Sequence, residues 1–345
     1  MDERVLLLPG DGIGPEVVGA ARQVLEAVRP DLQYEEVAIG LGALRATGRP
    51  YPADLVEIAR ASDAVLLGAV GGEQDSTIAW DERPEAGLFA LRQGLDLYAN
   101  LRPVRLLAPL AGRSVLRLDL AADVDLLIVR ELVGGAYFGA KGIRDGRTFD
   151  TIEYSEPEVE RIVRRAFELA AGRRSHVTSV DKANILRTSV LWRSVAERIA
   201  AAHPDIRCDH LLVDNAAMQL LQRPASFDVI VTENLFGDIL SDEAAALVGG
   251  LGLLPSASLG APGTAGLFEP VHGSAPDIAG AGIANPTGAV LSAAMLLRHG
   301  CGDAANADRI DAAVYGAFAD GVRTPDLGGS HGTAVMTAAI IAGLG

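Results

Sequence analysis

The chain has 345 residues, of which 49% are hydrophobic and 22% are charged, and its formal net charge is -15 at pH 7. This length exceeds what one hydrophobic core usually serves, so we expect one large α/β unit or two lobes of ordinary size. The acidic charge argues against nucleic acid or an anionic membrane as the main partner, and no run approaches the roughly 20 apolar residues that cross a bilayer. The two cysteines, Cys208 and Cys301, are too few for a disulfide framework or a cysteine metal cage.

The first residues, 1–9, lack the basic flank and the long apolar region of a signal peptide, which predicts a cytoplasmic protein. A strand over 5–8 leads into Gly10-Asp11-Gly12-Ile13-Gly14, a glycine-rich turn that opens a helix and resembles a phosphate-binding loop. The turn lacks the full G-x-G-x-x-G spacing and a P-loop lysine. Strand and helix patterns then alternate at 33–39, 52–60 and 63–67, which predicts a parallel sheet covered by helices.

Three arginines follow an irregular polar stretch over 71–85, a length of loop that is usually functional or disordered. Arg92 lies on a helix over 85–97, Arg102 precedes a proline that favours extended backbone, and Arg130 ends a buried strand. Ligands gather at the ends of parallel strands, and guanidinium pairs bidentately with carboxylate. The three arginines therefore suit a substrate with two carboxylates, although each taken alone could be a solvated surface charge.

Two further candidates follow later strands. Lys182 lies where a strand over 175–180 gives way to a helix, and the helix dipole there favours the neutral amine that a general base needs. A snorkelling surface lysine is the alternative interpretation. Asp214 follows a strand over 211–213, and Met218 beyond it looks like an ordinary core residue.

Asp238 and Asp242 lie four residues apart beside an apolar run. At helical spacing they share one face, and Phe236, Leu240 and Leu247 fall on the opposite side. The helix can therefore bury one face and direct two aspartates outward, as a half-site for a hard metal ion. For an isolated pair of this kind, a solvated acidic face is the alternative.

The region beyond residue 250 is loop-rich up to Phe268, and helices are expected at 288–299, 303–320 and 333–343. Small residues over 268–287 allow the backbone to approach a flat ligand closely. His272, taken alone, would more often be a structural histidine.

Together these segments resemble the β-decarboxylating dehydrogenases, which oxidise a 2-hydroxy acid and lose the carboxylate at C3. The resemblance runs nearly end to end, and its most specific pieces are Asn-Leu-Phe-Gly-Asp-Ile-Leu-Ser-Asp-Glu at 234–243 and His-Gly-Ser-Ala-Pro-Asp-Ile-Ala-Gly at 272–280. Within the family, the chain is most similar to the branch that acts on 3-isopropylmalate in leucine biosynthesis. The resemblance implies an α/β, two-lobed isopropylmalate dehydrogenase-like fold with a doubly wound sheet, not a Rossmann dinucleotide fold. Residues 1–98 with 252–345 would form the cofactor-side domain, and 99–251 the dimerisation and metal/substrate domain.

The resemblance also implies roles for individual residues. Lys182 would act as base and Tyr137 as acid. Mg²⁺ or Mn²⁺ would be bound by Asp238 and Asp242, joined by Asp214 from a second subunit. The substrate would be contacted by Arg92, Arg102, Arg130, Glu85, Leu88 and Phe89. The cofactor would lie along His272, Gly273, Ser274, Ala275, Asp277, Ile278 and Asn285.

Asp277 would accept hydrogen bonds from the adenosine ribose and would repel a 2′-phosphate, so NAD is favoured over NADP. Since Lys182 and Asp214 would cross a subunit boundary, the resemblance implies a homodimer with shared active sites that acts on a small 2-hydroxy dicarboxylate.

The apolar Leu88 and Phe89 suit an alkyl side chain, whereas isocitrate enzymes offer a polar group there. Phe89, Val133 and the segment 73–80 depart from the isopropylmalate pattern. Another 3-alkylmalate, D-malate, tartrate or homoisocitrate is therefore an alternative substrate. Two alternatives of another class are a non-catalytic regulatory subunit, which should have lost the base, acid or metal residues, and a module that only binds a dicarboxylate.

Overall fold

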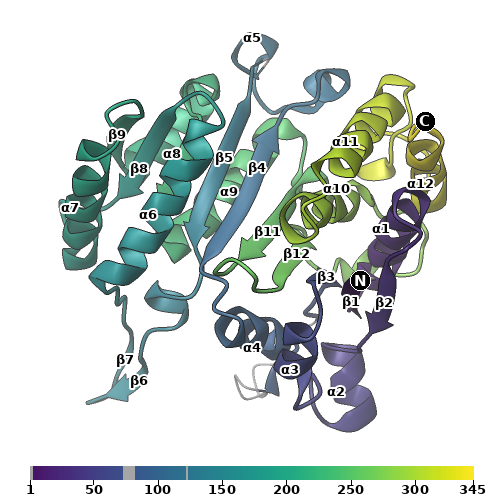
Figure 1. The fold of residues 1–345 in the computed structure, drawn as a ribbon, viewed down its shortest axis with the longest axis horizontal. Coiled ribbons are helices and arrows are strands. Elements are labelled where there is room, and N and C mark those ends of the chain that lie inside the picture. The colour runs from purple at the N-terminus through teal and green to yellow at the C-terminus, as the bar shows by residue number, and fades with distance from the viewer. Residues whose placement is uncertain (1–2, 73–81, 122) are drawn as a thin grey trace. The chain divides into compact units, whose positions relative to one another are not determined.

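The computed structural model describes residues 3–72, 82–121 and 123–345 (Figure 1). The chain divides into two compact units, the first Met1–Leu97 with Gly250–Gly345 and the second Tyr98–Gly249. Both combine strands and helices, so the α/β class predicted from the sequence is confirmed. The segment 73–80, whose composition departs from the family pattern, lies outside the described residues.

In the first unit, neighbouring strands follow the order β2-β1-β3-β12-β11. The strands are β1 (Arg4–Gly10), β2 (Gln33–Glu36), β3 (Ala64–Ala69), β11 (Pro255–Leu259) and β12 (Gly266–Pro270). Pairing is parallel except between β11 and β12. The loop-rich prediction beyond residue 250 is therefore wrong for β11 and β12. Ser256 and Ser258 resemble loop residues in the sequence, yet both are buried, and Ser256 Oγ donates to the carbonyl of Glu269 at 3.0 Å.

Helices cover both faces of this first group of strands (Figure 1). They are α1 (Gly14–Val28), α2 (Leu41–Thr47), α3 (Leu55–Arg60), α4 (Ala86–Gly94), α10 (Thr287–Met295) with a π-helical extension (Leu296–Gly300), α11 (Ala304–Ala319) and α12 (Thr333–Ala342). Leu6 and Leu8 of β1 share a core cluster with Leu55 of α3 and Leu91 of α4. Because side chains alternate along a strand, Val5 and Leu7 are directed to the other face, where α1 packs against α10 and α12.

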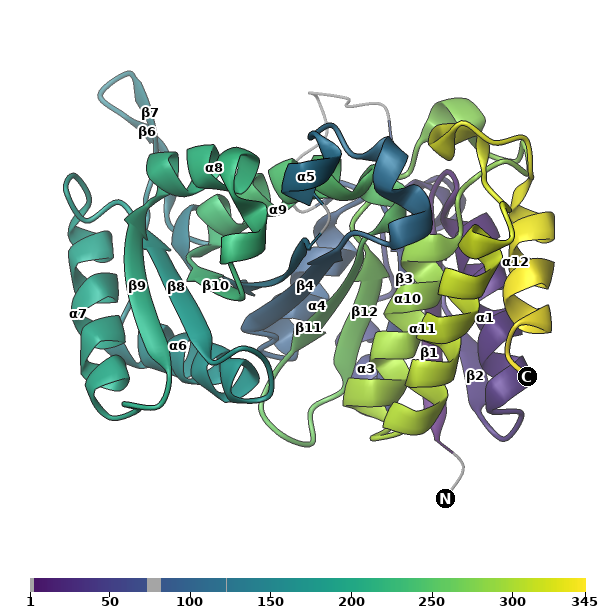
Figure 2. The ribbon, with the colours of Figure 1, turned by 90° about the horizontal axis from the view of Figure 1, so that it is seen from above.

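In the second unit, neighbouring strands follow the order β4-β5-β10-β8-β9. The strands are β4 (Ala99–Arg105), β5 (Asp125–Glu131), β8 (His176–Asp181), β9 (Arg207–Leu212) and β10 (Val229–Thr232). The helices are α5 (Leu118–Ala121), α6 (Glu156–Ala171), α7 (Arg187–Ala201), α8 (Val213–Gln222) and α9 (Asn234–Val248). An antiparallel hairpin of β6 (Lys141–Arg144) and β7 (Arg147–Asp150) projects from this unit (Figure 2).

The strands β5, β10 and β8 run parallel, so their carboxyl ends meet at one edge. Arg130 and Glu131 end β5, Lys182 follows β8, and Glu233 follows β10. This edge is where open α/β sheets usually hold ligands. In the part of the chain that the structure describes, no helix is both long and apolar enough to cross a membrane.

Candidate active site

The carboxylate of Asp238, one turn into α9, is the meeting point of three predicted site residues. Its Oδ1 accepts a hydrogen bond of 2.5 Å from Nη1 of Arg130 and lies 3.3 Å from Nη2 of Arg102. Its Oδ2 accepts a hydrogen bond of 2.5 Å from the hydroxyl of Tyr137. The structure thus brings together an acid candidate, two carboxylate-binding candidates and a metal-ligand candidate from separate elements of the second unit.

Arg130 is held in place from both sides. Its side chain is 1% exposed. Its Nε donates to the carbonyl of Asn234 at 2.9 Å, and its Nη2 donates to Oδ1 of Asn234 at 2.8 Å. A Cβ on Gly237 would lie 2.6 Å from Cγ of Arg130, so this position of α9 has no room for a side chain. The guanidinium also lies over the ring of Tyr137, 5.2 Å from its centroid.

Burial and the neighbouring Asp238 charge raise the pKa of Tyr137 above its usual value. The phenol is therefore protonated at neutral pH, which is the state from which a proton donor must start.

Asp242 lies one turn beyond Asp238 on the same face of α9. Its Oδ1 is 3.6 Å from Nη1 of Arg102, and its side chain is 57% exposed. Partial burial and the charge of Asp238 raise the pKa of Asp242. Arg102 also donates to Ser241 Oγ at 2.6 Å and to Asn100 Oδ1 at 2.8 Å, which fixes its guanidinium between the two aspartates.

The predicted apolar face of α9 is only partly correct. Leu240 and Leu247 are fully buried, but Phe236 is half-buried. In this first helical turn it is Gly237 that faces the packed side chain of Arg130. On the outer side, Ile239 is 56% exposed.

Lys182 and Asp214 form a pair away from this cluster. Nζ of Lys182, just beyond β8, donates to a carboxylate oxygen of Asp214, in the first turn of α8. This hydrogen bond lowers the pKa of Asp214. Among the described residues of one chain, no group of three or more His, Cys, Asp or Glu side chains could hold a metal ion. The structure therefore joins the candidate base to the third carboxylate, but does not join that carboxylate to Asp238 and Asp242.

Arg92 and the predicted specificity residues lie on or next to α4, in the first unit. Nη2 of Arg92 donates to Oε1 of Glu269 at 2.8 Å, and both side chains are buried. The Nε of Arg92 is buried and has no hydrogen-bond partner among the described residues. Glu85 precedes the helix, Leu88 packs against the core cluster and Phe89 is half-buried.

The predicted cofactor segment connects β12 to α10 and contains a short 3-10 helix, Pro276–Ile278. Nδ1 of His272 is 2.9 Å from the carbonyl of Gly273, and the buried Nε2 has no partner within the described part of the chain. Burial lowers the pKa of His272, which favours the neutral ring. Ala275 adopts a left-handed backbone with φ of 39°, and Asp277 beyond it is exposed.

Asn285, at the end of this segment, is buried and anchored. Its Nδ2 donates to Oδ2 of Asp326 at 3.0 Å, and its Oδ1 accepts from the backbone N–H of Thr287 at 3.0 Å. Earlier in the segment, the carbonyl of Ser274 accepts from the backbone N–H of Ile13 at 2.8 Å.

The glycine-rich turn at 10–14 does not have the geometry of a phosphate-binding loop. The N–H groups of Asp11, Ile13 and Gly14 all donate to backbone carbonyls, which leaves them unavailable to an anion. The Asp11 carboxylate instead accepts from the N–H groups of Leu41, Gly42 and Gly71, at 2.9, 3.1 and 3.0 Å. The turn therefore supports the predicted cofactor segment through Ile13 and caps the start of α2 through Asp11.

Several partners in these networks were not predicted from the sequence to be site residues, namely Asn100, Asn234, Ser241, Glu269 and Asp326. Asn234 is the first residue of the matched 234–243 motif, and Glu269 precedes a proline at the end of an unpredicted strand. The only local signal is a polar residue beside a matched motif, which does not reveal a distant partner.

The chain matches one protein family over nearly its whole length. The model of the family described as isocitrate/isopropylmalate dehydrogenase matches residues 4–342. The chain belongs to this family. The resemblance noted from the sequence motifs is therefore confirmed.

Relatives in this family resemble the chain over nearly its full length. The 3-isopropylmalate dehydrogenase of Shouchella clausii is 53% identical over 99% of this chain and 96% of its own length. That of Nitratidesulfovibrio vulgaris is 55% identical over 95% of this chain and 94% of its own length. Among solved structures, isocitrate dehydrogenase from Methylococcus capsulatus has a TM-score of 0.90 and 39% identity, covering 99% of both chains. These likenesses confirm the predicted fold of the isocitrate/isopropylmalate dehydrogenase family.

Proposed function

We propose that the chain catalyses NAD-dependent oxidative decarboxylation of (2R,3S)-3-isopropylmalate to 2-oxo-4-methylpentanoate and CO₂ in leucine biosynthesis. The observation that carries this proposal is the 53% and 55% identity, over nearly the whole chain, to relatives named 3-isopropylmalate dehydrogenase. The convergence of Arg102, Arg130 and Tyr137 on Asp238 supports it, because a dicarboxylate substrate needs fixed cations and a proton donor.

Arg92, Arg102 and Arg130 would bind the carboxylates of the substrate. Arg130 and Arg102 are held rigidly by neighbouring side chains, so little ordering entropy is lost when a ligand binds. Arg92 has a buried Nε without a partner among the described residues, which a substrate carboxylate would satisfy. Leu88 and Phe89, one helical turn before Arg92, would contact the isopropyl group.

Lys182 would accept the proton of the C2 hydroxyl while the hydride at C2 passes to the nicotinamide. The resulting 2-oxo acid carries a carboxylate on C3 and loses it as CO₂. The electron pair of the broken C–C bond then forms a double bond between C2 and C3, and the negative charge lies on the C2 oxygen. Tyr137 would give a proton to C3. The hydrogen bond from Tyr137 to Asp238 holds the phenol in one orientation for this step.

A divalent cation fits the donor set. Asp238 and Asp242 present hard oxygen donors from one face of α9, and Asp214 of a second subunit would complete the site. When bound, Mg²⁺ or Mn²⁺ would stabilise negative charge on the C2 oxygen in both chemical steps.

NAD would bind along the segment from His272 to Asn285. The Nε2 of His272, which has no partner among the described residues, and the exposed carboxylate of Asp277 are groups that a nucleotide would satisfy. A carboxylate at residue 277 favours NAD over NADP, since a 2′-phosphate beside it would be repelled.

A cytoplasmic homodimer would be the working unit. Exposed apolar side chains occur on the hairpin and on α8 and α9, namely Ile143, Met218, Leu221 and Ile239. Met218 is 47% exposed, so its interpretation as a core residue is wrong for this chain on its own. Because Asp214 lies on α8, a second copy that covers α8 and α9 would bring the Lys182 and Asp214 pair to a neighbouring site.

The proposal is tested by NAD reduction with the purified protein and Mg²⁺, comparing 3-isopropylmalate with D-malate, isocitrate, homoisocitrate and tartrate. NADP and a chelator serve as controls. We expect chelator-sensitive turnover that prefers 3-isopropylmalate and NAD. Preference for another acid would identify that acid as the substrate and would assign specificity to residues 73–89. No turnover with any acid would favour a non-catalytic subunit, although Lys182, Tyr137, Asp214, Asp238 and Asp242 are all present.

A further inference from the structure

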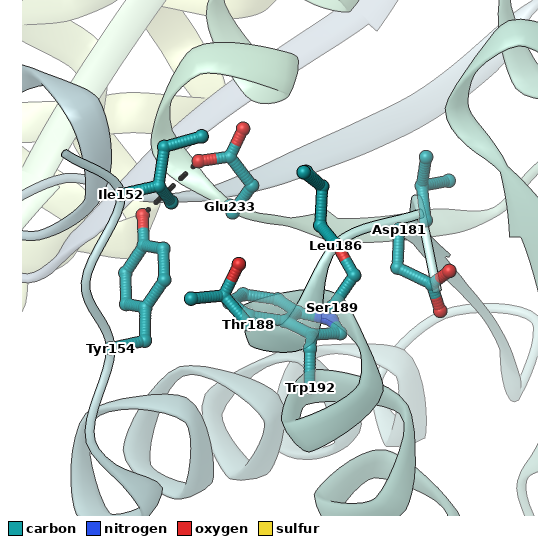
Figure 3. A pocket seen from close by; sticks show the side chains of 9 residues that line it. Ile152, Tyr154, Asp181, Leu186, Thr188, Ser189, Trp192 and Glu233 are labelled. Carbon is teal, nitrogen blue, oxygen red and sulfur yellow. Dashed lines mark hydrogen bonds between the residues drawn. The ribbon is translucent and has the colours of Figure 1, made fainter. Parts of the chain in front are cut away.

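Two buried carboxyl groups and a phenol lie next to the residues that position Arg130 and Tyr137. They belong to Glu131, Tyr154 and Glu233, which we call the buried cluster. Glu131 is 0% exposed and Glu233 is 6% exposed. The Tyr154 hydroxyl donates to Oε2 of Glu233 at 3.3 Å (Figure 3). None of these residues was predicted from the sequence to act in the reaction.

The cluster connects to Arg130 through the start of α9. The Tyr154 hydroxyl accepts from the backbone N–H of Asn234 at 3.1 Å. Oε1 of Glu233 accepts from the backbone N–H of Phe236 at 2.9 Å and so caps the same helix. Asn234 in turn binds the Arg130 guanidinium through both its backbone carbonyl and its side-chain oxygen. A displacement of Asn234 would therefore rotate Arg130 away from its present geometry.

The cluster connects to Tyr137 through a pair of glycines. Oε2 of Glu131 accepts from the N–H of Gly134 at 2.9 Å, and the carbonyl of Gly134 accepts from Nδ2 of Asn234 at 3.0 Å. A Cβ on Gly134 would lie 2.5 Å from Cε1 of Tyr154, and one on Gly135 would lie 2.4 Å from its hydroxyl oxygen. The phenol thus packs directly on the turn that begins the 3-10 helix Gly135–Tyr137.

Both connections end at the same carboxylate, because Arg130 and Tyr137 each bind Asp238. We propose that Tyr154 is a positioning residue. It holds Asn234 and the Gly134–Gly135 turn next to each other. Arg130 and Tyr137 thereby stay within hydrogen-bond distance of Asp238. In this proposal Tyr154 acts through these neighbours and not on the substrate itself. The inference rests on the proposed function, in which Tyr137 is the proton donor and Arg130 binds substrate.

The first test is Tyr154→Phe, which removes one hydroxyl and keeps the ring on the glycine turn. Tyr34→Phe is the matched control, because the Tyr34 hydroxyl is buried in the first unit and has no partner among the described residues. We expect kcat with 3-isopropylmalate to fall about tenfold to a hundredfold in Tyr154→Phe, since small misplacements of reacting groups have effects of this size. The KM for NAD should stay within about twofold of the wild-type value, because the cofactor segment lies in the other unit.

A merely structural role would give a different result. It would lower the melting temperature or the yield of folded protein while leaving kcat per folded site unchanged. Exchange of the C3 hydrogens of 2-oxo-4-methylpentanoate with deuterated solvent reports on proton transfer without hydride transfer. We expect this exchange to fall in proportion to kcat in Tyr154→Phe and to stay unchanged in Tyr34→Phe. Wild-type kcat and exchange in Tyr154→Phe would overturn the proposal.

A second variant and a measurement without turnover complete the test. Glu233→Gln keeps an oxygen that can accept from the Phe236 N–H but removes the carboxylate that accepts from the Tyr154 hydroxyl. We therefore expect a smaller fall in kcat than in Tyr154→Phe. Crystal structures of wild-type protein and Tyr154→Phe would compare the contacts of Tyr137 and Arg130 with Asp238. If the wild-type protein turns over no tested acid, the proposed function is wrong. If Tyr137 and Arg130 keep their contacts with Asp238 in the Tyr154→Phe crystal structure, the positioning role is wrong.

Discussion

Arg92 and Glu269 form a buried ion pair of 2.8 Å between residues that are 177 positions apart in the chain. The pair joins α4 to β12 within the first unit. Glu269 thus balances the charge of an arginine that we expect to bind substrate.

Replacing Glu269 with Ala should destabilise the protein, because the buried Arg92 guanidinium would lose its counter-charge. Breaking one partner of a buried pair costs roughly 3 to 5 kcal/mol. Urea unfolding should show a lower midpoint for Glu269→Ala, with Glu35→Ala as a control for an exposed ion pair. Equal midpoints for the two variants would contradict the assigned importance of the buried pair.

Replacing Lys182 with Met should abolish turnover and spare folding. A positioned general base contributes roughly a hundredfold to ten-thousandfold to the rate, whereas the exposed pair with Asp214 adds little to stability. Steady-state NAD reduction and a thermal melt on the same preparation would test both statements. Wild-type activity in Lys182→Met would remove this residue from the mechanism.

Replacing Tyr137 with Phe should slow the reaction by roughly a hundredfold or more, because the proposed proton donor for C3 is lost. The substrate KM should change little, since Arg102 and Arg130 remain. Tyr315→Phe is a suitable control, because Tyr315 is exposed on α11 in the other unit. A large rise in KM with unchanged kcat would instead assign Tyr137 to substrate binding.

Glu131 should make stability depend on pH. Burial raises its pKa from 4.5 to about 7. Because the folded state holds this proton more tightly than the unfolded state, the free energy of unfolding falls as pH rises from about 4.5 to about 7 and stays low above that. This rise in the pKa corresponds to roughly 3 to 4 kcal/mol at most.

The variant Glu131→Gln cannot titrate at this position. The loss of stability between pH 5 and pH 8 should therefore be smaller in the variant than in the wild-type protein. Urea unfolding at both pH values measures this difference directly. An identical pH dependence in the two proteins would show that Glu131 is ionised in the folded state throughout this range.

Replacing Asp277 with Asn should weaken the preference for NAD. The variant loses the charged acceptor that we propose for the ribose hydroxyls, which should lower kcat/KM for NAD about tenfold. It also loses the charge that repels a 2′-phosphate, so kcat/KM for NADP should rise. Unchanged values for both cofactors would place the adenosine ribose elsewhere.

The sequence by itself determined the features that depend on local periodicity and on order along the chain. The spacing of Asp238 and Asp242 placed both on one face of a helix. The ends of apolar runs placed Arg130 at the end of a strand and Lys182 just beyond one. Helical and strand repeats are set by residues within a few positions of each other, so such features can be predicted from one sequence.

Only the tertiary structure decided which side chains meet. Tyr137 and Asp238 are 101 positions apart, and Asn234 and Gly134 are 100 apart. Nor could the sequence show that Asp11 binds the backbone of α2, because its glycine-rich surroundings are equally typical of a phosphate loop. The partner of a buried charge is chosen by desolvation and by the packing of distant elements, and neither is encoded in local spacing.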